Sequence, residues 1–412
     1  MARNGNSKGM KETKFKDTEL GKIPEEWDYG KFEDYLDKFS AGATPYRGIA
    51  SNFIGTIPWV SSGELNYNYI TDTREHISQD AQKSTHLTLH PKGTFLIAIT
   101  GLEAAGTRGR CAFIETPATT NQSCLAIYST EKMIVEYLFW FYQQWSDYLA
   151  FNFSQGSKQQ SFTAEIVKKL PIYAPSLAEQ QRIASALSDA DALVAELDAL
   201  IEKKRAIMAG TMQELLTGKR RLKGFDEPWS EEVLRNHLSF LPGFPFTSDR
   251  FSKVACGPRL IRNRDLHSDD QVVYYTGEFS NQYIIENGDL LIGMDGDFTP
   301  CLWEKGNAVL NQRVGRIICK NTANIVFLYY LLQKPLAELQ ESTGATTVKH
   351  LSHSTIENMV CRMPKLAEQH AIATILSDMD AEIAELEAKR DKYKEVRQGM
   401  MQQLLTGKIR LI

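Results

Sequence analysis

The chain has 412 residues, of which 42% are hydrophobic and 24% charged, and its formal net charge is −4. This length predicts two to three domains, each large enough to bury its own core. The sequence has no run of 18 or more apolar residues, and residues 1–16 are too polar for a signal peptide. The six cysteines form no C-x-x-C pair, which argues against a zinc ribbon and predicts reduced thiols in a cytoplasmic protein without a membrane span.

The charge balance argues against a nucleic-acid-binding protein but does not exclude one. Residues 223–363 carry 14 Lys and Arg against 17 Asp and Glu. Proteins that bind a phosphate backbone are expected to show a basic footprint instead. A local basic patch or a basic partner subunit could still supply the phosphate contacts, so composition leaves the function open.

The first half of the chain begins with a polar stretch. Residues 1–20 are rich in Lys, Gly and Asn and are expected to be mobile. A first globular domain is expected over residues 21–174. Its β-rich apolar run at 95–99 predicts a sheet, and its apolar run at 137–142 predicts a buried helix. The pattern favours a mixed α/β domain with irregular loops.

Residues 175–222 are the segment around which the chain is organised, because they return at 364–411. The two copies align without a gap and are identical at 27 of 48 positions. Both contain P-x-L-A-E-Q near the start and L-L-T-G-K near the end. An ungapped repeat of this length predicts a tandem of two halves, each a globular domain followed by one long helix.

The apolar residues of the repeat step by three and four, which keeps one narrow seam on a helix and is typical of a coiled coil. Ser176 and Glu179 match a capping box, and Gly218 and Gly407 suit the left-handed residue that ends a helix. About 40 residues between these signals give a helix of roughly 60 Å. Such a helix needs a partner for its seam, and the nearest is its own repeat; two unrelated surface helices are the alternative. The predicted seam consists of Ile183, Leu187, Val194, Leu197, Ile201, Ile372, Leu376, Ile383 and Leu386.

A second globular domain is expected over residues 223–363, followed by the second spacer helix over 364–412. It matches the first domain only at anchors in the same order, such as Trp229 for Trp27 and Asn311-Gln312 for Asn121-Gln122. The apolar runs at 290–294 and 309–310 predict a sheet and the run at 327–332 a buried helix. The loops between anchors share nothing. One scaffold is therefore predicted to carry two different surfaces.

At this point the sequence resembles a known family, the specificity subunits of Type I restriction-modification systems. The resemblance rests on the stretches at 21–27 (GKIPEEW), 42–45 (GATP) and 57–65 (IPWVSSGEL), and above all on the doubled P-x-L-x-E-Q-x-x-I junction. Two departures are Ala43 in place of a second glycine, and a second domain that lacks Thr-Pro and reads GFPFT at 243–247. The resemblance implies an α+β protein with two target-recognition domains, whose two helices pair as an antiparallel coiled coil about a pseudo-twofold.

The resemblance also implies what the protein does and what it binds. It implies a DNA-recognition subunit that reads a bipartite, asymmetric target on double-stranded DNA, with half-sites roughly 34 Å apart. Two methyltransferase subunits would bind S-adenosylmethionine and modify adenine at N6. Restriction and translocase subunits would use ATP and Mg²⁺. No cofactor is expected in this chain. Lys and Arg at 203–205 and 219–221 are candidate residues for docking the partner subunits, and the alternative is that they are ordinary solvated surface residues.

No catalytic signature was found in the sequence. It contains no Asn/Asp-Pro-Pro-Tyr/Phe motif, no G-x-G-x-x-G and no G-x-x-x-x-G-K-[ST]. Asp295, Asp297 and Glu304 could imitate a metal-dependent nuclease site, although acidic residues around a glycine more often form a turn. The prediction is therefore no catalytic and no metal residue, with two alternatives: a stand-alone nuclease, or a coiled-coil interaction scaffold with two ligand-binding globules.

The candidate DNA-binding residues are those whose chemistry suits bases or phosphates. Arg reads guanine and Asn or Gln reads adenine, while Ser, Thr and Lys also contact phosphates. Any single exposed Arg or Lys is more often a solvated surface residue, so the clusters are stronger candidates than their members. They are Thr44, Tyr46, Arg47, Ser61, Ser62, Arg108, Arg110, Ser157, Lys158, Gln159 and Gln160 in the first domain, and Arg250, Arg259, Arg262, Asn263, Arg264, Arg313, Thr346, Thr347 and Lys349 in the second.

Overall fold

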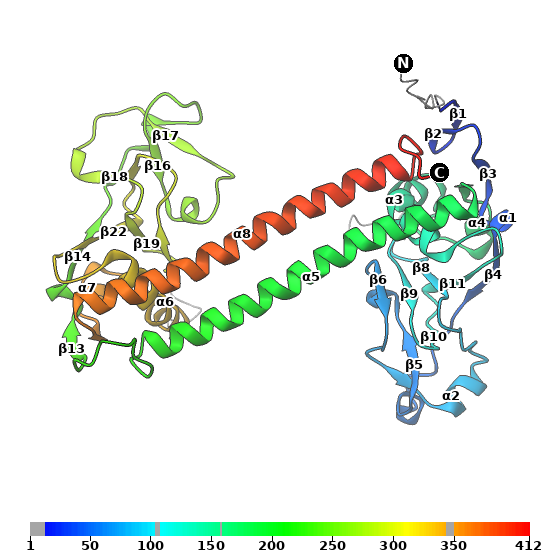
Figure 1. Cartoon of the computed structure of the whole chain (residues 1–412), viewed down its shortest axis with the longest axis horizontal. Coiled ribbons are helices and arrows are strands. Elements are labelled where there is room, and N and C mark those ends of the chain that lie inside the picture. The colour runs from blue at the N-terminus through cyan, green and yellow to red at the C-terminus, as the bar shows by residue number, and fades with distance from the viewer. Residues whose placement is uncertain (1–12, 104–107, 157–158, 343–349) are drawn as a thin grey trace, which may run out of the picture. The chain divides into compact units, whose positions relative to one another are not determined.

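The structure is a computed structural model that describes residues 13–103, 108–156, 159–342 and 350–412 (Figure 1). It divides into two compact units. The first unit runs up to Glu196 and includes Lys389–Ile412, and the second unit comprises Leu197–Ala388. Each unit thus holds one globular region, the start of one long helix and the end of the other. Among the described residues, no helix is both long and apolar enough to cross a membrane.

The core of the first unit is a five-stranded sheet in the order β4-β11-β8-β9-β6. Its pairs are antiparallel except for β6 with β9. Strands β8 and β9 are buried along their whole length, which explains why they read as continuous apolar runs in the sequence. Helix α3 packs on β9, with the rings of Phe139 and Phe113 5.1 Å apart. The bounds are β4 Leu36–Ala41, β6 Asn68–Ile70, β8 Phe95–Ala98, β9 Cys111–Ile114, β11 Cys124–Ser129 and α3 Val135–Phe153.

Smaller sheets complete the first unit. A three-stranded sheet has the order β10-β5-β7, with β10 and β5 parallel, and two-stranded sheets join β1 to β2 and β3 to β12. The turn of the β1–β2 hairpin buries Leu20 in the core. Residues 1–12 lie outside the described part, and the expected mobility of residues 1–20 stays a prediction. The bounds are β1 Phe15–Thr18, β2 Gly21–Pro24, β3 Asp28–Lys31, α1 Phe32–Tyr35, β5 Ile57–Val60, β7 His76–Ile77, α2 Gln79–Ser84, β10 Thr119–Thr120, α4 Ala164–Lys168 and β12 Pro171–Ala174.

The second unit repeats this plan with different loops. Its sheets have the orders β14-β22-β19-β20, β15-β17-β16-β21-β18 and β13-β23. The predicted apolar runs fall on β19, β21 and helix α6, as they fall on β8 and α3 in the first unit. The bounds are β13 Ser230–Val233, β14 Leu238–Pro242, β15 Phe251–Ser252, β16 Arg259–Ile261, β17 Val273–Tyr275, β18 Ile284–Ile285, β19 Leu290–Gly293, β20 Pro300–Leu302, β21 Ala308–Leu310, β22 Val314–Cys319, α6 Ile325–Ser342, α7 His353–Glu357 and β23 Val360–Met363.

The two long helices are α5 (Leu177–Leu215) and α8 (Leu366–Leu404), each of 39 residues. They pack together and run antiparallel. In the first unit Arg397 pairs with Asp191, and in the second Lys204 pairs with Glu382 at 2.6 Å. Gly218 and Gly407 take φ of +69° and +68° after the helix ends, so both predicted left-handed glycines are confirmed.

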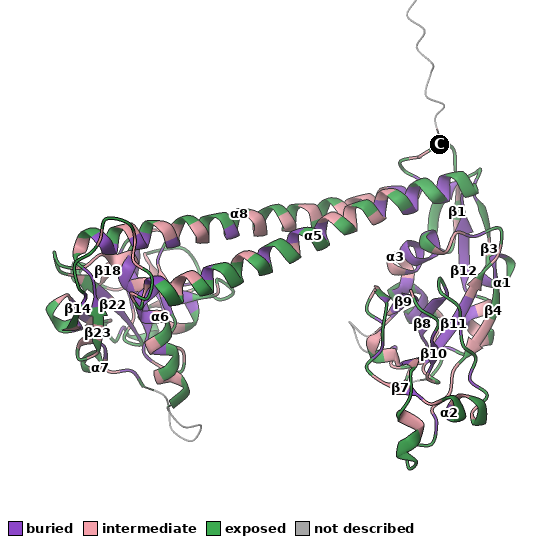
Figure 2. Cartoon of the chain, turned by 60° about the horizontal axis from the view of Figure 1, so that its bottom comes forward, coloured by how far each residue is buried: buried purple, intermediate pink, exposed green. Residues whose placement is uncertain are grey.

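Most of α5 and α8 outside the predicted seam is exposed or half-buried (Figure 2). All nine seam residues are buried except Leu386, which is half-buried. Their surroundings differ along the helix. Ile183 and Leu187 belong to the core of the first globular region, and Ile372 and Leu376 to the core of the second. The seam therefore also fixes the start of each helix onto its own globular region.

The start of each long helix carries a buried carboxylate. In the first unit Glu179 is 1% exposed, accepts from Trp27 Nε1 at 3.2 Å, and binds both Nε and Nη2 of Arg410 at 2.7 and 2.8 Å. Glu179 N donates to Ser176 Oγ at 3.4 Å, but the Glu179 carboxylate accepts from Trp27 and Arg410 instead of closing the predicted capping box.

The second unit has the same arrangement, which we call the latch in both units. Glu368 is 2% exposed, accepts from Trp229 Nε1 at 3.0 Å, and takes two hydrogen bonds of 2.8 Å from Arg221. Arg221, which was named as a candidate docking residue, thus holds the start of α8 in this structure. Each latch joins the start of one long helix to the segment that follows the end of the other.

The glutamine after each latch carboxylate orients the buried helix of its globular region. Gln180 Oε1 accepts from Ile134 N at 2.8 Å, at the start of α3. Gln369 Oε1 accepts from Asn324 N at 2.9 Å, at the start of α6. The repeated Glu-Gln pair thus contacts the tryptophan before β3 or β13, the start of the buried helix and the segment after the opposite long helix. These shared contacts account for its appearance in both copies.

Candidate nucleic-acid interface

The loop that follows β4 in the first unit, and the loop that follows β14 in the second, each meet the end of a strand of a neighbouring sheet, β10 or β21. In the first unit Ala43 N donates to Thr120 O at 3.1 Å, and in the second Phe244 N donates to Leu310 O at 2.9 Å. A Cβ on Gly42 would lie 1.9 Å from Thr120 O, and one on Gly243 2.2 Å from Asn311 O. Only glycine permits this approach of two backbones.

We call this meeting place the loop corner: residues 42–47 with 120–122 in the first unit, and 243–246 with 310–313 in the second. The turn that carries Asn121 and Asn311 is held the same way in each, since Asn121 N donates to Val60 O at 2.9 Å and Asn311 N to Ile261 O at 3.1 Å. The repeated Asn-Gln pair therefore stands at a framework position. The sequence contained a signal for the corner, a glycine at 42 and at 243 with an aromatic residue within the next four positions, but not its partner turn.

Three predicted residues of the first domain share one loop corner. Thr44 Oγ1 donates to Gln122 Oε1, Tyr46 is 74% exposed, and Arg47 projects with a side chain that is 56% exposed. The guanidinium of Arg47 binds both carboxylate oxygens of Glu75, at 2.7 and 2.8 Å.

The Arg47 side chain is also held by aromatic rings, because its guanidinium lies 4.5 Å from the centre of the Phe53 ring and 5.4 Å from that of Trp59. The hydrogen bonds with Glu75 raise the pKa of Arg47, and those with Arg47 lower the pKa of Glu75. Both groups therefore stay charged near neutral pH. Sequence reasoning missed Glu75, which stands 28 residues away with no spacing signal.

The other candidates of the first domain mainly build loops. Ser61 Oγ and Ser61 N both bind Glu64 Oε2 at 2.8 Å, and Ser62 begins the short helical turn that this cap starts. Arg108 donates to the carbonyls of Leu102 and Glu103 at 2.8 and 3.0 Å. These contacts use the side chains to hold backbone.

The remaining first-domain candidates lie at two further places. Gln160 N donates to Glu103 Oε2 at 3.1 Å, and the neighbouring Gln159 is exposed. Arg110 lines a polar cavity of about 520 Å³ together with Asn68 and Asp72. Ser157 and Lys158 were predicted as DNA-binding residues and lie outside the described part of the chain.

The arginines of the second domain separate by exposure. Arg259 is 14% exposed, pairs with Asp269 and lies 5.2 Å from the Trp303 ring centre. Arg262 is 22% exposed and binds both oxygens of Asp265 at 2.8 and 3.0 Å. These two guanidinium groups hold the fold and face the interior.

Asn263 and Arg264 also make internal contacts. Asn263 Nδ2 donates to the carbonyl of Asp295, and Arg264 Nη1 donates to Gln271 Oε1 at 2.9 Å from an exposed position. Arg250 is exposed at the end of a short helical turn. Thr346, Thr347 and Lys349 were predicted as DNA-binding residues and lie outside the described residues.

Arg313 belongs to the second loop corner and is 54% exposed. Its Nη1 lies 2.9 Å from Asp295 Oδ2, and the other oxygen of Asp295 is 2.8 Å from His350 Nδ1. The same carboxylate was part of the acidic cluster considered as a nuclease site. Asp297, from that cluster, is bound by Thr299 Oγ1 at 2.7 Å. Within the described ranges, no three His, Cys, Asp or Glu side chains are grouped to hold a metal ion.

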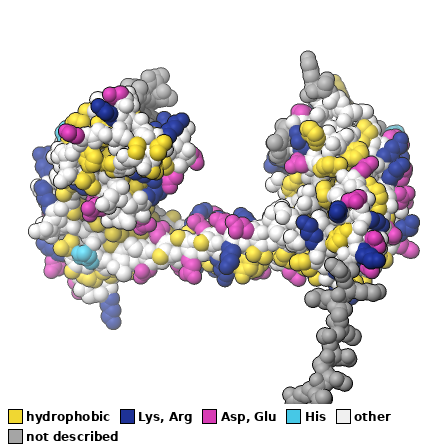
Figure 3. Space-filling view, turned by 90° about the horizontal axis from the view of Figure 1, so that it is seen from above, with side chains coloured by type: hydrophobic (Ala, Val, Ile, Leu, Met, Phe, Trp, Pro, Cys, Tyr) yellow, Lys and Arg dark blue, Asp and Glu magenta, His cyan; other side chains and the backbone are white. Residues whose placement is uncertain are grey.

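The surface carries mixed charges. On the face in view in Figure 3, acidic and basic side chains alternate along α5 and α8 and over both units. Several of the basic groups are already paired, such as Arg205 with Glu202 and Glu387, and Arg220 with Glu214. Together with the net charge of −4, this makes a purely electrostatic grip on phosphates weak.

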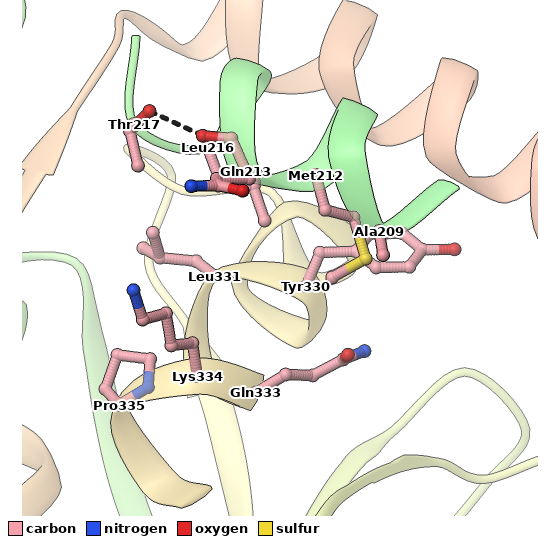
Figure 4. Close-up of a pocket in the computed structure, with 10 residues that line it drawn as sticks. All are labelled: Ala209, Met212, Gln213, Leu216, Thr217, Tyr330, Leu331, Gln333, Lys334 and Pro335. Carbon is pink, nitrogen blue, oxygen red and sulfur yellow. Dashed lines mark hydrogen bonds between the residues drawn. The ribbon is translucent and has the colours of Figure 1, made fainter. Parts of the chain in front are cut away.

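An apolar cavity of about 640 Å³ lies in the second unit, away from the loop corner, between the end of α5 and α6. Figure 4 shows Met212 of α5, and Leu216 just after its end, facing Leu331 and Tyr330 of α6 across it. Pro335 and the exposed Lys334 close its edge. Among the described residues that line it, Lys334 is the one with a charged side chain.

Two proteins with related sequences are of the same kind, specificity subunits of Type I restriction enzymes. The chain is 33% identical over 193 residues to the Type I restriction enzyme EcoBI specificity subunit of Escherichia coli, a match that covers 46% of this chain and 41% of that one. It is 25% identical to the Type I restriction enzyme MjaIX specificity subunit of Methanocaldococcus jannaschii over 97% of both chains.

Solved structures share the fold. The S subunit of the Type I restriction-modification system from M. genitalium superposes with a TM-score of 0.61 at 14% identity, covering 92% of this chain and 96% of that chain. A chain from a structural study of complex assembly in the type I R-M system superposes with a TM-score of 0.56 at 15% identity, covering 94% and 99%. Residues 24–204 and 252–395 match the family described as Type I restriction modification DNA specificity domain. The chain belongs to this family.

Proposed function

We propose that this chain is the DNA-recognition subunit of a Type I restriction-modification system. Each unit would read one half of a bipartite, asymmetric target on double-stranded DNA. The observation that carries the proposal is the loop corner: both units build it on corresponding strands, yet its loops differ in sequence, reading GATPYR at 42–47 and GFPF at 243–246. One scaffold with two surfaces is what the reading of two different half-sites requires.

The catalytic steps would belong to partner subunits. Two methyltransferase subunits would bind S-adenosylmethionine and methylate adenine at N6, and restriction subunits would use ATP and Mg²⁺. Methylation of a base in a duplex requires that the base leave the stack. The role of this chain would be to choose where that happens by holding the partners at a defined sequence.

The paired helices would fix the unread gap between the two half-sites. Deleting one opposed heptad from each of α5 and α8 shortens a helix by roughly 10 Å at 1.5 Å per residue. The permitted gap should then change while both half-sites keep their sequences. The same gap in the shortened protein would remove the spacer role.

The test of the proposed function is co-expression of this chain with its cognate methyltransferase subunit, followed by mapping of N6-methyladenine in the host DNA. A split motif should appear, and it should vanish when this chain is omitted. Omission of the methyltransferase is the matched control. A stable complex that leaves no motif in the DNA would contradict the proposal.

A second candidate function is an interaction scaffold whose two globular regions bind protein or sugar. The net charge of −4 favours it, because phosphate binding gains from a basic surface. The two candidates differ in one measurable respect. A scaffold shows no sequence preference on DNA even with its partners present.

A further inference from the structure

Each loop corner exposes one aromatic ring and one arginine that is anchored to a carboxylate. In the first unit these are Tyr46 and Arg47, with Arg47 bound to Glu75. In the second they are Phe244, 41% exposed, and Arg313, bound to Asp295. The two arginines come from different segments: Arg47 follows β4, whereas Arg313 precedes β22. The fold therefore brings an aromatic ring and an arginine to the loop corner of each unit, although the two arginines come from different segments of their units.

We propose that Arg47 and Arg313 each read one base edge, most favourably the O6/N7 edge of guanine, in the half-site of their own unit. The proposal rests on the proposed function, since it supposes that the corners face DNA. Arginine contacting guanine in the major groove is the commonest specific base contact, and an aromatic neighbour can contact a thymine methyl group. Glu75 and Asp295 are then positioning residues.

The ion pair with Glu75 leaves Arg47 able to bind a base edge. A guanidinium has five N–H donors, of which Glu75 takes one from each terminal nitrogen of Arg47. Within the described structure, the side-on edge with Nε–H stays available for a bidentate contact. Because Phe53 and Trp59 hold the guanidinium plane, less side-chain entropy is lost on binding than for a mobile arginine.

The paired carboxylate also decides between base and phosphate. An arginine beside an ionised glutamate contributes almost no net charge, so it adds little to the sequence-independent attraction for DNA. Hydrogen bonds to a base edge depend on geometry and survive this neutralisation. The Arg47–Glu75 pair is therefore suited to specificity more than to affinity.

Among the predicted DNA-binding arginines that are described as pairing with a carboxylate, exposure separates these two from Arg259 and Arg262. Arg259 and Arg262 also pair with carboxylates, but their side chains are only 14% and 22% exposed, against 56% for Arg47 and 54% for Arg313. A buried guanidinium cannot reach the floor of a groove. In Arg47 and in Arg313 the same guanidinium is both anchored to a carboxylate and exposed.

The experiment uses the full chain in complex with its methyltransferase subunit. Arg47→Ala, Arg47→Lys and Arg313→Ala are compared with wild type by mapping N6-methyladenine, and by measuring the salt dependence of binding to duplexes that contain the motif. Arg74→Ala, at an exposed arginine of the first unit outside the corner, is the matched control. Thermal melting of each complex identifies variants that fail to fold.

We expect Arg47→Ala to relax one position of one half-site, with a loss of discrimination of roughly five- to a hundredfold, while the other half-site stays intact. Arg47→Lys should fold and relax the same position, because the lysine ammonium lacks the planar fork of donors that binds both Glu75 oxygens and a base edge at once. Arg313→Ala should relax the opposite half-site. The control should leave the motif unchanged.

Two results would overturn the inference while leaving the proposed function standing. One is an unchanged motif in folded Arg47→Lys and Arg313→Ala complexes. The other is a uniform loss of binding to all duplexes with a smaller salt slope, which identifies a phosphate contact. If the wild-type complex forms but gives no motif, the proposed function itself fails, and this inference fails with it.

Discussion

The ends of the two long helices carry the same residues but meet different surroundings. In the first unit Trp145 Nε1 donates to Tyr173 Oη at 2.7 Å, and Tyr173 Oη donates to Leu405 O at 2.6 Å, so rings fill the space beside the end of α8. In the second unit the corresponding positions are Pro335 and Arg362, and the cavity of about 640 Å³ lies beside the end of α5. Leu405 is fully buried, whereas the equivalent Leu216 is half-buried.

The latches show the opposite behaviour, because each part of one has its counterpart in the other. Trp27, Glu179 and Arg410 correspond to Trp229, Glu368 and Arg221, with nearly the same distances. A buried carboxylate tolerates little variation, since the removal of either partner leaves a charge without compensation. An apolar space can be filled by many combinations of side chains or left partly open. The comparison therefore distinguishes a required contact from an optional one.

The largest expected effect is at the latch. Glu179→Ala removes the acceptor of Trp27 Nε1 and of two Arg410 nitrogens, and leaves the Arg410 guanidinium, 10% exposed, paired with the exposed Glu26 at 3.3 Å. We expect a loss of about 3–5 kcal/mol in the stability of the first unit. Glu368→Ala should cost less in the second unit, because Arg221 is 27% exposed and water can reach it. Denaturant unfolding followed by hydrogen exchange and mass spectrometry measures each unit separately.

The control for the latch is Arg205→Ala, which removes exposed ion pairs with Glu202 and Glu387. Surface pairs contribute roughly 0–1 kcal/mol, so this variant should be nearly neutral. Equal losses for Arg205→Ala and Glu179→Ala would contradict the claim that the latch is the required contact.

A smaller effect is expected where rings fill the first unit. Trp145→Ala removes a half-buried indole that packs on the Tyr148 and Tyr173 rings at 6.0 and 6.4 Å. We expect a loss of about 3 kcal/mol, the lower end for such a truncation, because the site is partly open to water. Melting of the purified chain should show the first unit weakened and the second unchanged. A loss of stability confined to the second unit would contradict the comparison between the two helix ends.

The sequence predicted the helices well because their signals are local. The apolar steps of three and four and Gly218 and Gly407 place both helices with bounds within a few residues, and the apolar runs fall on β8, β19, α3 and α6. The latch had a signal as well, since Glu179 and Arg221 are among the identical positions of the repeat. Sequence alone could not say that this arginine binds the carboxylate of the opposite copy.

The candidate interface stays a prediction, and its residues differ in ways that the sequence does not show. Ser61, Arg108 and Arg262 have the chemistry of DNA-binding residues, but their side chains are used to hold backbone or a neighbouring acid. Exposure and pairing decide between the two uses, and both depend on contacts between distant segments. Arg47 with Glu75 and Arg313 with Asp295 become distinct from the other arginines only once the chain is folded.

The smallest expected effect concerns the second unit, where a cavity lies beside the end of α5. Pro335 lies inside α6, at the position that Trp145 takes in α3, and proline there removes a backbone hydrogen bond. Pro335→Ala restores the donor, and we expect the second unit to gain on the order of 1 kcal/mol. This is part of the roughly 3 kcal/mol between proline and alanine in a helix interior, because apolar contacts of the ring at the cavity edge are lost.

Thermal melting measures the gain at Pro335→Ala, and Ala337→Gly, at an exposed position of the same helix, is a control that should cost about 1 kcal/mol. A loss of stability in Pro335→Ala would show that the proline is needed where it stands. The nearest reason would be Leu336, which is fully buried next to it and would be displaced if the helix straightened. The cavity would then be a shape that the second unit maintains, and the difference between the two helix ends would be a constraint of the fold.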